Sequence, residues 1–326
     1  MRFLLTSEQR AFARSLDAML AAADTPAVVR AWGAGDAAPG RALWSRVAGA
    51  GVFALAAPEE YEGAGLLPVE LAVAFVELGR HAMPGPLVET VAACTLLARL
   101  AELGEQGPAK RLLPGLVSGA CAASVLFPGA GPYALDADAA DALLAVADQE
   151  VRLAPGHGLV QPSADPARRL SRPLPGGELL ASGPRLTDAV RHATTWARLA
   201  AAGQCLGIAE ALLARTVAYV RQRTQFGVPV GSFQAVKHRL ADTLVAVEFA
   251  RPLLYGAALT LSPAEVAAAK VTAGEAAYAA ARTALQLHGA VGYTQELDVS
   301  LWLRKARPLR DAWGTPSQCR AAVLDG

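Results

Sequence analysis

Apolar positions in the first part of the chain recur every three to four residues, which is the period of an amphipathic helix. Thr6, with Gln9 three positions later, has the pattern of a capping box and predicts the start of the first helix. Further helices are expected at residues 41–49, 68–79, 87–103 and 108–117, several with proline before them and glycine after them. We therefore expect an N-terminal helical domain over residues 1–119.

Between residues 120 and 186 the pattern changes to short apolar runs separated by turn residues. The runs cover residues 124–127, 143–147, 151–154, 158–161 and 178–181. Two connecting segments, Asp148-Gln149 and Pro175-Gly176-Gly177, contain residues typical of tight turns. This spacing predicts a small β domain built from hairpins.

From residue 187 the helical period returns in longer segments. One helix is predicted to bury a single stripe made of Phe233, Val236, Leu240, Leu244 and Val247. Ser262 and Pro263 predict the start of another helix, which extends to His288 and stops at Gly289. Residues 187–326 thus read as a C-terminal four-helix bundle. The fold class is α+β, mainly α, in the order helical domain, small β domain, helical bundle.

Composition narrows the classes of function. The 326 residues carry a net charge of +1, which gives no electrostatic field for nucleic acid. Hydrophobic residues make up 53%, so we expect part of the apolar surface to be covered in subunit contacts. The four cysteines are far apart, which argues against a disulfide framework or zinc site and fits a cytoplasmic location. The longest uncharged run, residues 112–135, contains three prolines and is a poor membrane span.

Other motifs indicate less. The segment from Gly33 to Ala38 mimics a dinucleotide-binding fingerprint, but no strand precedes it, so a loop is expected. The five histidines are interpreted as having no partner four residues away and no nearby carboxylate in metal-ligand spacing, so we expect surface or packing roles for them and no metal site. No nucleophile elbow of the G-x-S-x-G type occurs, which argues against a hydrolase. The basic residues Arg304, Lys305, Arg307 and Arg310 fit phosphate contacts and a solvated helix face equally well.

Two C-terminal segments carry the most specific signal. They are Arg223-Thr224-Gln225-Phe226-Gly227, followed by Phe233-Gln234, and the segment from Gln286 to Tyr293, which reads Q-L-H-G-A-V-G-Y. Two N-terminal segments, P-E-E-Y-E-G-A-G at residues 58–65 and E-L-G-R at residues 77–80, complete the set. In this order, over nearly the whole chain, these segments resemble the acyl-CoA dehydrogenase family.

The resemblance implies an FAD site shared between two subunits. The resemblance implies that Arg223 offers its planar guanidinium to the FAD pyrophosphate and that Phe226 and Gly227 let the backbone turn tightly against the cofactor. Gln225 is expected to be a further cofactor-binding residue. Gln234 is expected to hydrogen-bond on the nucleotide side. Three further residues, Gln286, Gly289 and Ala290, are expected to approach the adenosine end of a flavin that the neighbouring subunit holds.

Departures from the family pattern are equally specific. Ala290 stands where the family has a second glycine, and the ring-binding segments of the β domain (T-E-x-x-x-G-S-D and W-x-T) are missing around residues 124–128. The family's catalytic glutamate position is Trp313, and a second position used for that base is Ala197. Neither residue accepts a proton. Asp311 is a weak candidate for a replacement base because its side chain is short and its register differs.

These features together resemble the base-lacking subunit of heterotetrameric actinobacterial acyl-CoA dehydrogenases. The implied partners are a catalytic acyl-CoA dehydrogenase subunit, an acyl-CoA substrate (for example a steroid side-chain thioester) and an electron-transfer flavoprotein as acceptor. Two alternatives remain open from the sequence. One is a self-sufficient flavoenzyme of the superfamily with an unusual base, and the other is a non-redox acyl-CoA-binding or structural subunit.

Overall fold

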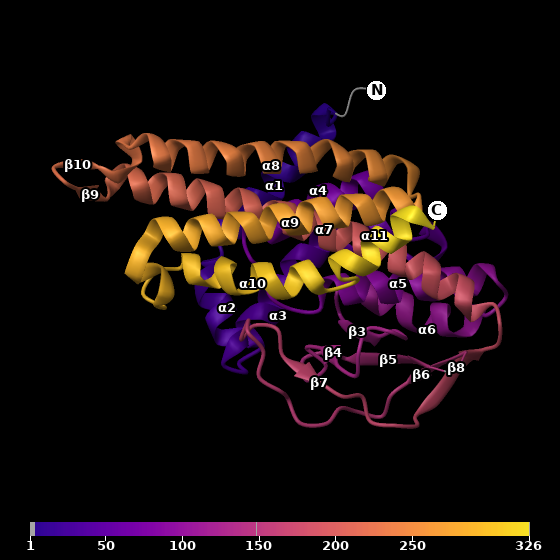
Figure 1. The fold of residues 1–326 in the computed structure, drawn as a ribbon. Coiled ribbons are helices and arrows are strands. Elements are labelled where there is room, and N and C mark those ends of the chain that lie inside the picture. The colour runs from indigo at the N-terminus through magenta and orange to yellow at the C-terminus, as the bar shows by residue number, and fades with distance from the viewer. Residues whose placement is uncertain (1–3, 148, 326) are drawn as a thin grey trace. The chain divides into compact units, whose positions relative to one another are not determined.

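The computed structural model describes residues 4–147 and 149–325 (Figure 1). Contacts divide the chain into two units. The first unit contains Met1–Pro26, Ala72–Met83 and Ala201–Gly326, and the second contains Ala27–Leu71 and Pro84–Ala200. The mainly helical fold class is confirmed, with helices at both ends of the chain and the sheet between them. The predicted three-domain division is not tested by these two units and stays a prediction.

The second unit contains the β structure and the helices around it. Its main sheet has four strands in the order β3 (Ala123–Leu126), β5 (Ala142–Ala147), β6 (Glu150–Leu153) and β8 (Glu178–Ser182). β3 and β5 are parallel, whereas the remaining neighbours are antiparallel. Two short strands, β4 (Ala134–Leu135) and β7 (Leu170–Ser171), form a separate pair, as do β1 (Ala56–Ala57) and β2 (Gly65–Leu66).

Helix α5 (Leu87–Glu102) is the buried centre of this unit, and nearly every residue along it is inaccessible. The hydroxyl of Thr90 both donates to the carbonyl oxygen of Ala123 and accepts from its N–H, which ties α5 to β3. The unit also contains α3 (Ala38–Gly49), α6 (Gln106–Val117), most of α2 (Thr25–Gly33), the start of α4 (Pro68–Arg80) and the first part of α7 (Leu186–Gln222).

One expectation for this region is wrong, and one helix was not expected. Residues 158–161 do not form a strand, because only Gln161 makes an isolated bridge there, to Leu170. The hairpin between β5 and β6 is present, although Asp148 of its predicted turn lies outside the described residues. The segment after Gly33 is a turn, as expected, but it follows helix α2, which the apolar pattern did not reveal.

The first unit is built from helices. α9 (Pro263–His288) packs against α8 (Gln234–Thr260), α10 (Val299–Asp311) and α11 (Pro316–Leu324). The unit also contains α1 (Ser7–Ala21), the end of α4 (Pro68–Arg80) and the later part of α7 (Leu186–Gln222). Thr6 and Gln9 form the predicted capping box, and α9 ends at Gly289 as predicted.

Glycine lets α4 and α7 approach closely within the first unit. A Cβ on Gly207 would lie 1.9 Å from the carbonyl oxygen of Val76, and one on Gly79 would lie 2.2 Å from that of Gln204. Real side chains never tolerate such distances, so the backbones of the two helices touch directly. α7 is also apolar enough over 18 residues to pass as a membrane span, but 78% of that window is buried inside the structure, as in a core helix.

The predicted single buried stripe of α8 is wrong at two of its positions. Phe233 precedes the helix and is 39% exposed, and Leu244 is 47% exposed. The helix buries Val247, Ala250 and Leu254 instead and carries a second, exposed apolar row that includes Phe249. Apolar side chains therefore occur on two faces of α8, and period alone could not tell which face is covered within one chain.

Candidate functional site

A cavity of about 720 Å³ lies at one end of the first unit, where α7, the β9–β10 hairpin, the start of α8 and the end of α9 meet. β9 (Thr224–Gln225) and β10 (Val228–Pro229) form the hairpin that extends at the left of Figure 1. The cavity wall combines Arg223 and Gln225 with Gln286, Gly289 and Ala290. Five of the seven predicted cofactor-binding residues, from two distant segments, thus line one space.

Arg223 is positioned by the backbone on either side of it. Its N–H donates to the carbonyl oxygen of Tyr219, which continues the last turn of α7, and its carbonyl oxygen accepts from Val230 across the hairpin. Its exposed guanidinium has no carboxylate partner among the described residues, in contrast to Arg251 and Arg310 of the same unit. An arginine left without a carboxylate at a cavity wall suits a phosphate oxygen pair.

Gly289 closes α9 with a φ of 64°. A Cβ added there would meet no heavy atom within 4 Å, so a side chain would project into open space rather than into the protein. Ala290 follows it in the exposed turn η4 (Gly289–Tyr293) and places one methyl group at the wall. A turn with so little side-chain bulk lets a ligand approach the backbone closely.

The sequence did not point to two further residues of the wall, Tyr219 and His288. Their rings stack with centroids 4.2 Å apart, and the Tyr219 hydroxyl donates to the carbonyl oxygen of His288 at 3.4 Å. Nδ1 of the buried His288 lies 2.7 Å from the carbonyl oxygen of Ala284, so this nitrogen carries the proton and Nε2 is the acceptor in the neutral ring. The packing role expected for this histidine is present, and it stiffens the cavity wall.

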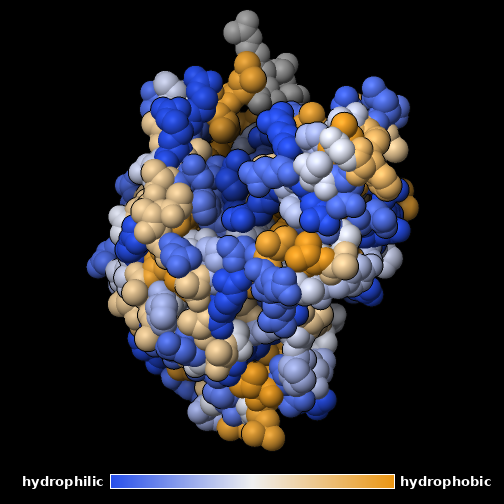
Figure 2. Space-filling model, turned by 90° about the vertical axis from the view of Figure 1, so that its left-hand side faces the viewer, coloured by the Kyte–Doolittle hydropathy of each residue, from blue (hydrophilic) through white to orange (hydrophobic). Residues whose placement is uncertain are grey.

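Phe226 and Gln234 are the two predicted residues that do not line the cavity. Phe226 occupies the turn between β9 and β10 with a φ of 55°, is 92% exposed and packs edge-on against Phe233. Gln234 is the exposed first residue of α8. Figure 2 turns the hairpin side toward the viewer, and hydrophilic residues predominate there with separate small hydrophobic groups. Cofactor contacts of these two residues remain predictions.

The segment that would carry a catalytic base is a tight connection between α10 and α11. Trp313 lies in it with a φ of 60°, and the capping box of Thr315 starts α11 two residues later. Asp311 ends α10, is exposed, and lies 4.0 Å from Arg310. Its carboxyl group is open to solvent, whereas a general base lies against its substrate in a site that excludes water. Ala197, at the second family position, is fully buried in α7.

Buried Lys270 of α9 anchors this connection. Its ammonium group donates to the carbonyl oxygens of Leu309 at 3.2 Å and Arg310 at 2.8 Å, which are among the last acceptors of α10. The favourable arrangement of a cation at a helix C-terminus joins α10 to α9. The predicted basic cluster does not act as one unit, because Lys305 is buried while Arg310 pairs with Glu275 and Arg307 is exposed.

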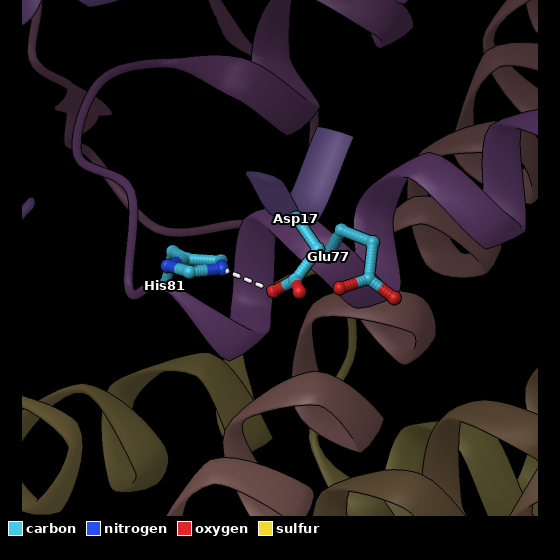
Figure 3. A group of neighbouring side chains, drawn as sticks. All are labelled: Asp17, Glu77 and His81. Atoms are coloured by element: carbon cyan, nitrogen blue, oxygen red, sulfur yellow. Dashed lines mark hydrogen bonds and ion pairs between the residues drawn. The ribbon is translucent and has the colours of Figure 1, made fainter. Parts of the chain in front are cut away.

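Asp17, Glu77 and His81 form the group that most resembles a metal site, and their ligand atoms lie within 4.8 Å of one another (Figure 3). Figure 3 shows Asp17 between the other two side chains, hydrogen-bonded only to His81, at 2.8 Å. Glu77 precedes His81 by four residues, a spacing the sequence interpretation overlooked. Asp17 comes from α1, so only the tertiary structure completes the group.

Arginine already neutralises this group. The guanidinium of Arg80 lies 2.9 Å from the carboxylate of Glu77 and also contacts Glu210, which lies 2.9 Å from Arg251. The pKa of Glu77 is raised to about 7. Burial is the main cause, the negative charges of Asp17 and Glu210 act in the same direction, and the positive charge of Arg80 acts against them. Because Glu77 is already paired with Arg80, and Asp17 with His81, these residues fit an ion-pair network better than a metal site.

Comparison with known proteins agrees with this geometry. Residues 6–120 match the family model described as acyl-CoA dehydrogenase, N-terminal domain, and residues 187–322 match acyl-CoA dehydrogenase, C-terminal domain. A curated relative, acyl-CoA dehydrogenase IpdE2 of Mycobacterium tuberculosis, is 37% identical over 305 residues, which are 92% of this chain and 91% of the relative.

Two solved structures share the fold. One is the ChsE4–ChsE5 complex from Mycobacterium tuberculosis, with a TM-score of 0.81, 24% identity, and coverage of 100% of this chain and 98% of that chain. The other is the Tcur3481–Tcur3483 steroid acyl-CoA dehydrogenase, with a TM-score of 0.81, 25% identity, and coverage of 98% and 97%. The family is one of FAD-binding flavoproteins. The chain belongs to the acyl-CoA dehydrogenase family.

Proposed function

We propose that this chain is the subunit without a catalytic base in a heteromeric FAD-dependent acyl-CoA dehydrogenase. One contrast within the molecule carries the proposal. The cavity at the end of α7 and α9 retains Arg223 and Gln286, whereas Trp313 and Ala197 occupy the positions of the base. A polypeptide with a nucleotide-binding wall and no proton acceptor suits a supporting role in a partner's active site.

The cavity fits the nucleotide half of FAD. Arg223 would hold the pyrophosphate through two parallel N–H···O contacts, and Gln225 and Gln286 would offer amides that both donate and accept. The Gly289–Ala290 turn leaves room beside the adenosine. When bound, FAD supplies the acceptor for the hydride that leaves the β carbon of the acyl thioester, while a carboxylate of the partner takes the α proton.

The named relatives support a large acyl group as substrate. One similar structure is described as a steroid acyl-CoA dehydrogenase, and another is a complex of two different chains. By analogy, the partner of this chain is a second acyl-CoA dehydrogenase that has the glutamate, and the substrate is a bulky thioester such as a steroid side-chain CoA. The proposed electron acceptor is an electron-transfer flavoprotein, and the proposed location is the cytoplasm.

Copurification with the partner tests the proposal. Expressed alone, the chain should bind little FAD, and coexpressed with a glutamate-bearing relative encoded next to it, the pair should be yellow and be bleached by an acyl-CoA. A fully flavinylated, active protein made of this chain alone would contradict the proposal.

A matched pair of substitutions then tests the cavity. Arg223→Gln removes the guanidinium group from the cavity wall. The control Arg221→Gln removes an exposed guanidinium group that does not line the cavity. Loss of a charged, paired hydrogen bond costs about 1.5–3 kcal/mol, so FAD should bind the Arg223→Gln complex roughly 10- to 100-fold more weakly. Equal FAD affinities for the two variants would show that Arg223 does not grip the cofactor.

A further inference from the structure

A second cavity of about 400 Å³ lies between α8 and α9 in the first unit. Arg239 of α8 and Arg282 of α9 line it, together with Thr283, Gln286 and Tyr293. Gln286 belongs to the walls of both cavities, so the second cavity adjoins the first. None of the family-like segments includes Arg239 or Arg282, and the proposed flavin contacts do not use them.

The charge of this cavity is unbalanced. Within the described chain, neither Arg239 nor Arg282 has a carboxylate within ion-pair distance, whereas Arg80, Arg251 and Arg310 of the same unit each have one. Two arginines in the wall of one cavity, with no carboxylate beside them in the described chain, make that cavity electropositive. An anion that enters the cavity therefore gains attraction from both arginines at once.

The cavity is held open by its own helices. The hydroxyl of Thr243 donates to the carbonyl oxygen of Arg239 at 2.9 Å and lies 3.2 Å from the hydroxyl of Thr283, which links α8 to α9 beside both arginines. Its volume lies in the range of small-ligand sites. It exceeds what a lone inorganic anion fills, so the ligand has a further part beyond its charged group.

Tyr293 indicates the nature of that part. Its ring is 77% exposed at the cavity wall, where it offers an aromatic face for stacking, while Thr283 and Gln286 offer hydrogen-bonding groups. Two positive charges match the dianion of a phosphomonoester, whereas a single carboxylate from another protein would leave one guanidinium without a counter-charge.

We propose that the Arg239–Arg282 cavity binds a nucleotide through a ribose phosphomonoester, with its base on Tyr293. The site adjoins the flavin cavity and shares Gln286 with it, but its two arginines make none of the proposed flavin contacts, so the inference goes beyond the proposed function. A free 5′-nucleotide and the 3′-phosphorylated adenosine end of a coenzyme A thioester both present this chemistry.

Titration calorimetry on the full-length chain at low ionic strength tests the site, with adenosine 5′-monophosphate, adenosine 3′-monophosphate and uncharged adenosine as probes. Wild type and Arg223→Gln should bind a monophosphate equally. The double variant Arg239→Gln/Arg282→Gln should bind it at least tenfold more weakly, and adenosine should bind wild type at least tenfold more weakly than the monophosphate. Tighter binding of adenosine 3′-monophosphate would identify the adenosine end of coenzyme A as the natural ligand, and tighter binding of adenosine 5′-monophosphate would identify a free nucleotide.

Three results would overturn the inference. They are a loss of monophosphate binding in Arg223→Gln instead of the double variant, equal binding of adenosine and monophosphates, and no binding at millimolar concentration. Binding to the isolated chain that disappears in the complex would also overturn it, since the partner's surface would then fill the cavity. Both arginines are exposed, so circular dichroism should show a folded double variant. The FAD content of the double variant in the complex should equal that of wild type, which separates this test from the flavin proposal.

Discussion

The ion-pair network around Glu77 predicts that the first unit is less stable at alkaline pH than at pH 5. Glu77 is 6% exposed, and its pKa is raised from 4.5 to about 7, first by burial and then by Asp17 and Glu210, against the attraction of Arg80. A carboxyl group with a raised native pKa binds its proton more tightly in the folded state. Its contribution to stability is therefore complete below pH 4.5 and disappears as the pH rises through 7.

The size of the effect follows from the shift. The rise from 4.5 to about 7 corresponds to roughly 3 kcal/mol, most of which is lost between pH 5 and pH 8. Glu77→Gln keeps the shape of the protonated side chain and an acceptor for Arg80, and Arg80 retains Glu210. The variant should match wild type at pH 5 and exceed it at pH 8.

Urea unfolding at pH 5 and pH 8 measures the difference. Trp302 is fully buried in the first unit and donates from Nε1 to the carbonyl oxygen of Arg80 at 2.9 Å, so tryptophan fluorescence reports on this region. Burial also raises the pKa of Asp136 in the second unit to about 7, which adds a loss of the same sign in both proteins. Glu296→Gln, at an exposed glutamate of the first unit, is the control. If Glu77→Gln loses as much stability as wild type between the two pH values, the reasoning is refuted.

Three further substitutions test other parts of the structure. Gly207→Ala would place a methyl carbon 1.9 Å from the carbonyl oxygen of Val76, and urea unfolding should show a loss of about 3 kcal/mol in stability. The control Gly49→Ala, at an exposed helical position, should be neutral or slightly stabilising. Equal effects of the two substitutions would contradict the close crossing of α4 and α7. Lys270→Met leaves two carbonyl groups at the end of α10 without their hydrogen-bond donor and should lower the free energy of unfolding by about 1–3 kcal/mol. Proteolysis between α10 and α11 should become faster. An unchanged digestion rate would show that Lys270 does not hold this connection in place. Asp311→Asn should leave turnover and flavin content of the assembled enzyme unchanged, and abolished turnover would instead favour a self-sufficient enzyme that uses Asp311 as its base.

Local signals in the sequence were sufficient for many elements. The sequence correctly predicted the start of α1 from the capping box at Thr6, and both ends of α9 from Ser262-Pro263 and Gly289. Helix ends are predictable in this way because capping depends on residues only a few positions apart. The resemblance to family motifs pointed to the segments that supply Arg223 and Gln286. Family-like motifs therefore identified most of the cavity wall before any geometry was known.

Other features needed the folded chain. The meeting of Asp17 with Glu77 depends on the packing of α1 against α4, and the stacking of Tyr219 on His288 depends on how α7 lies beside the end of α9. Phe249 looks like a core residue by its chemistry but is exposed, because α8 has apolar side chains on two faces.

The sequence by itself determined where several helices begin and end, because capping depends on residue identity and short-range spacing. The retained nucleotide-binding residues and the replacement of the base by Trp313 are predictions that rest on the family resemblance. The tertiary structure alone decided which arginines have carboxylate partners, so that Arg80 is neutralised while Arg223, Arg239 and Arg282 are left to face open cavities. Charge balance depends on distances between side chains far apart in the chain, and only packing sets those distances.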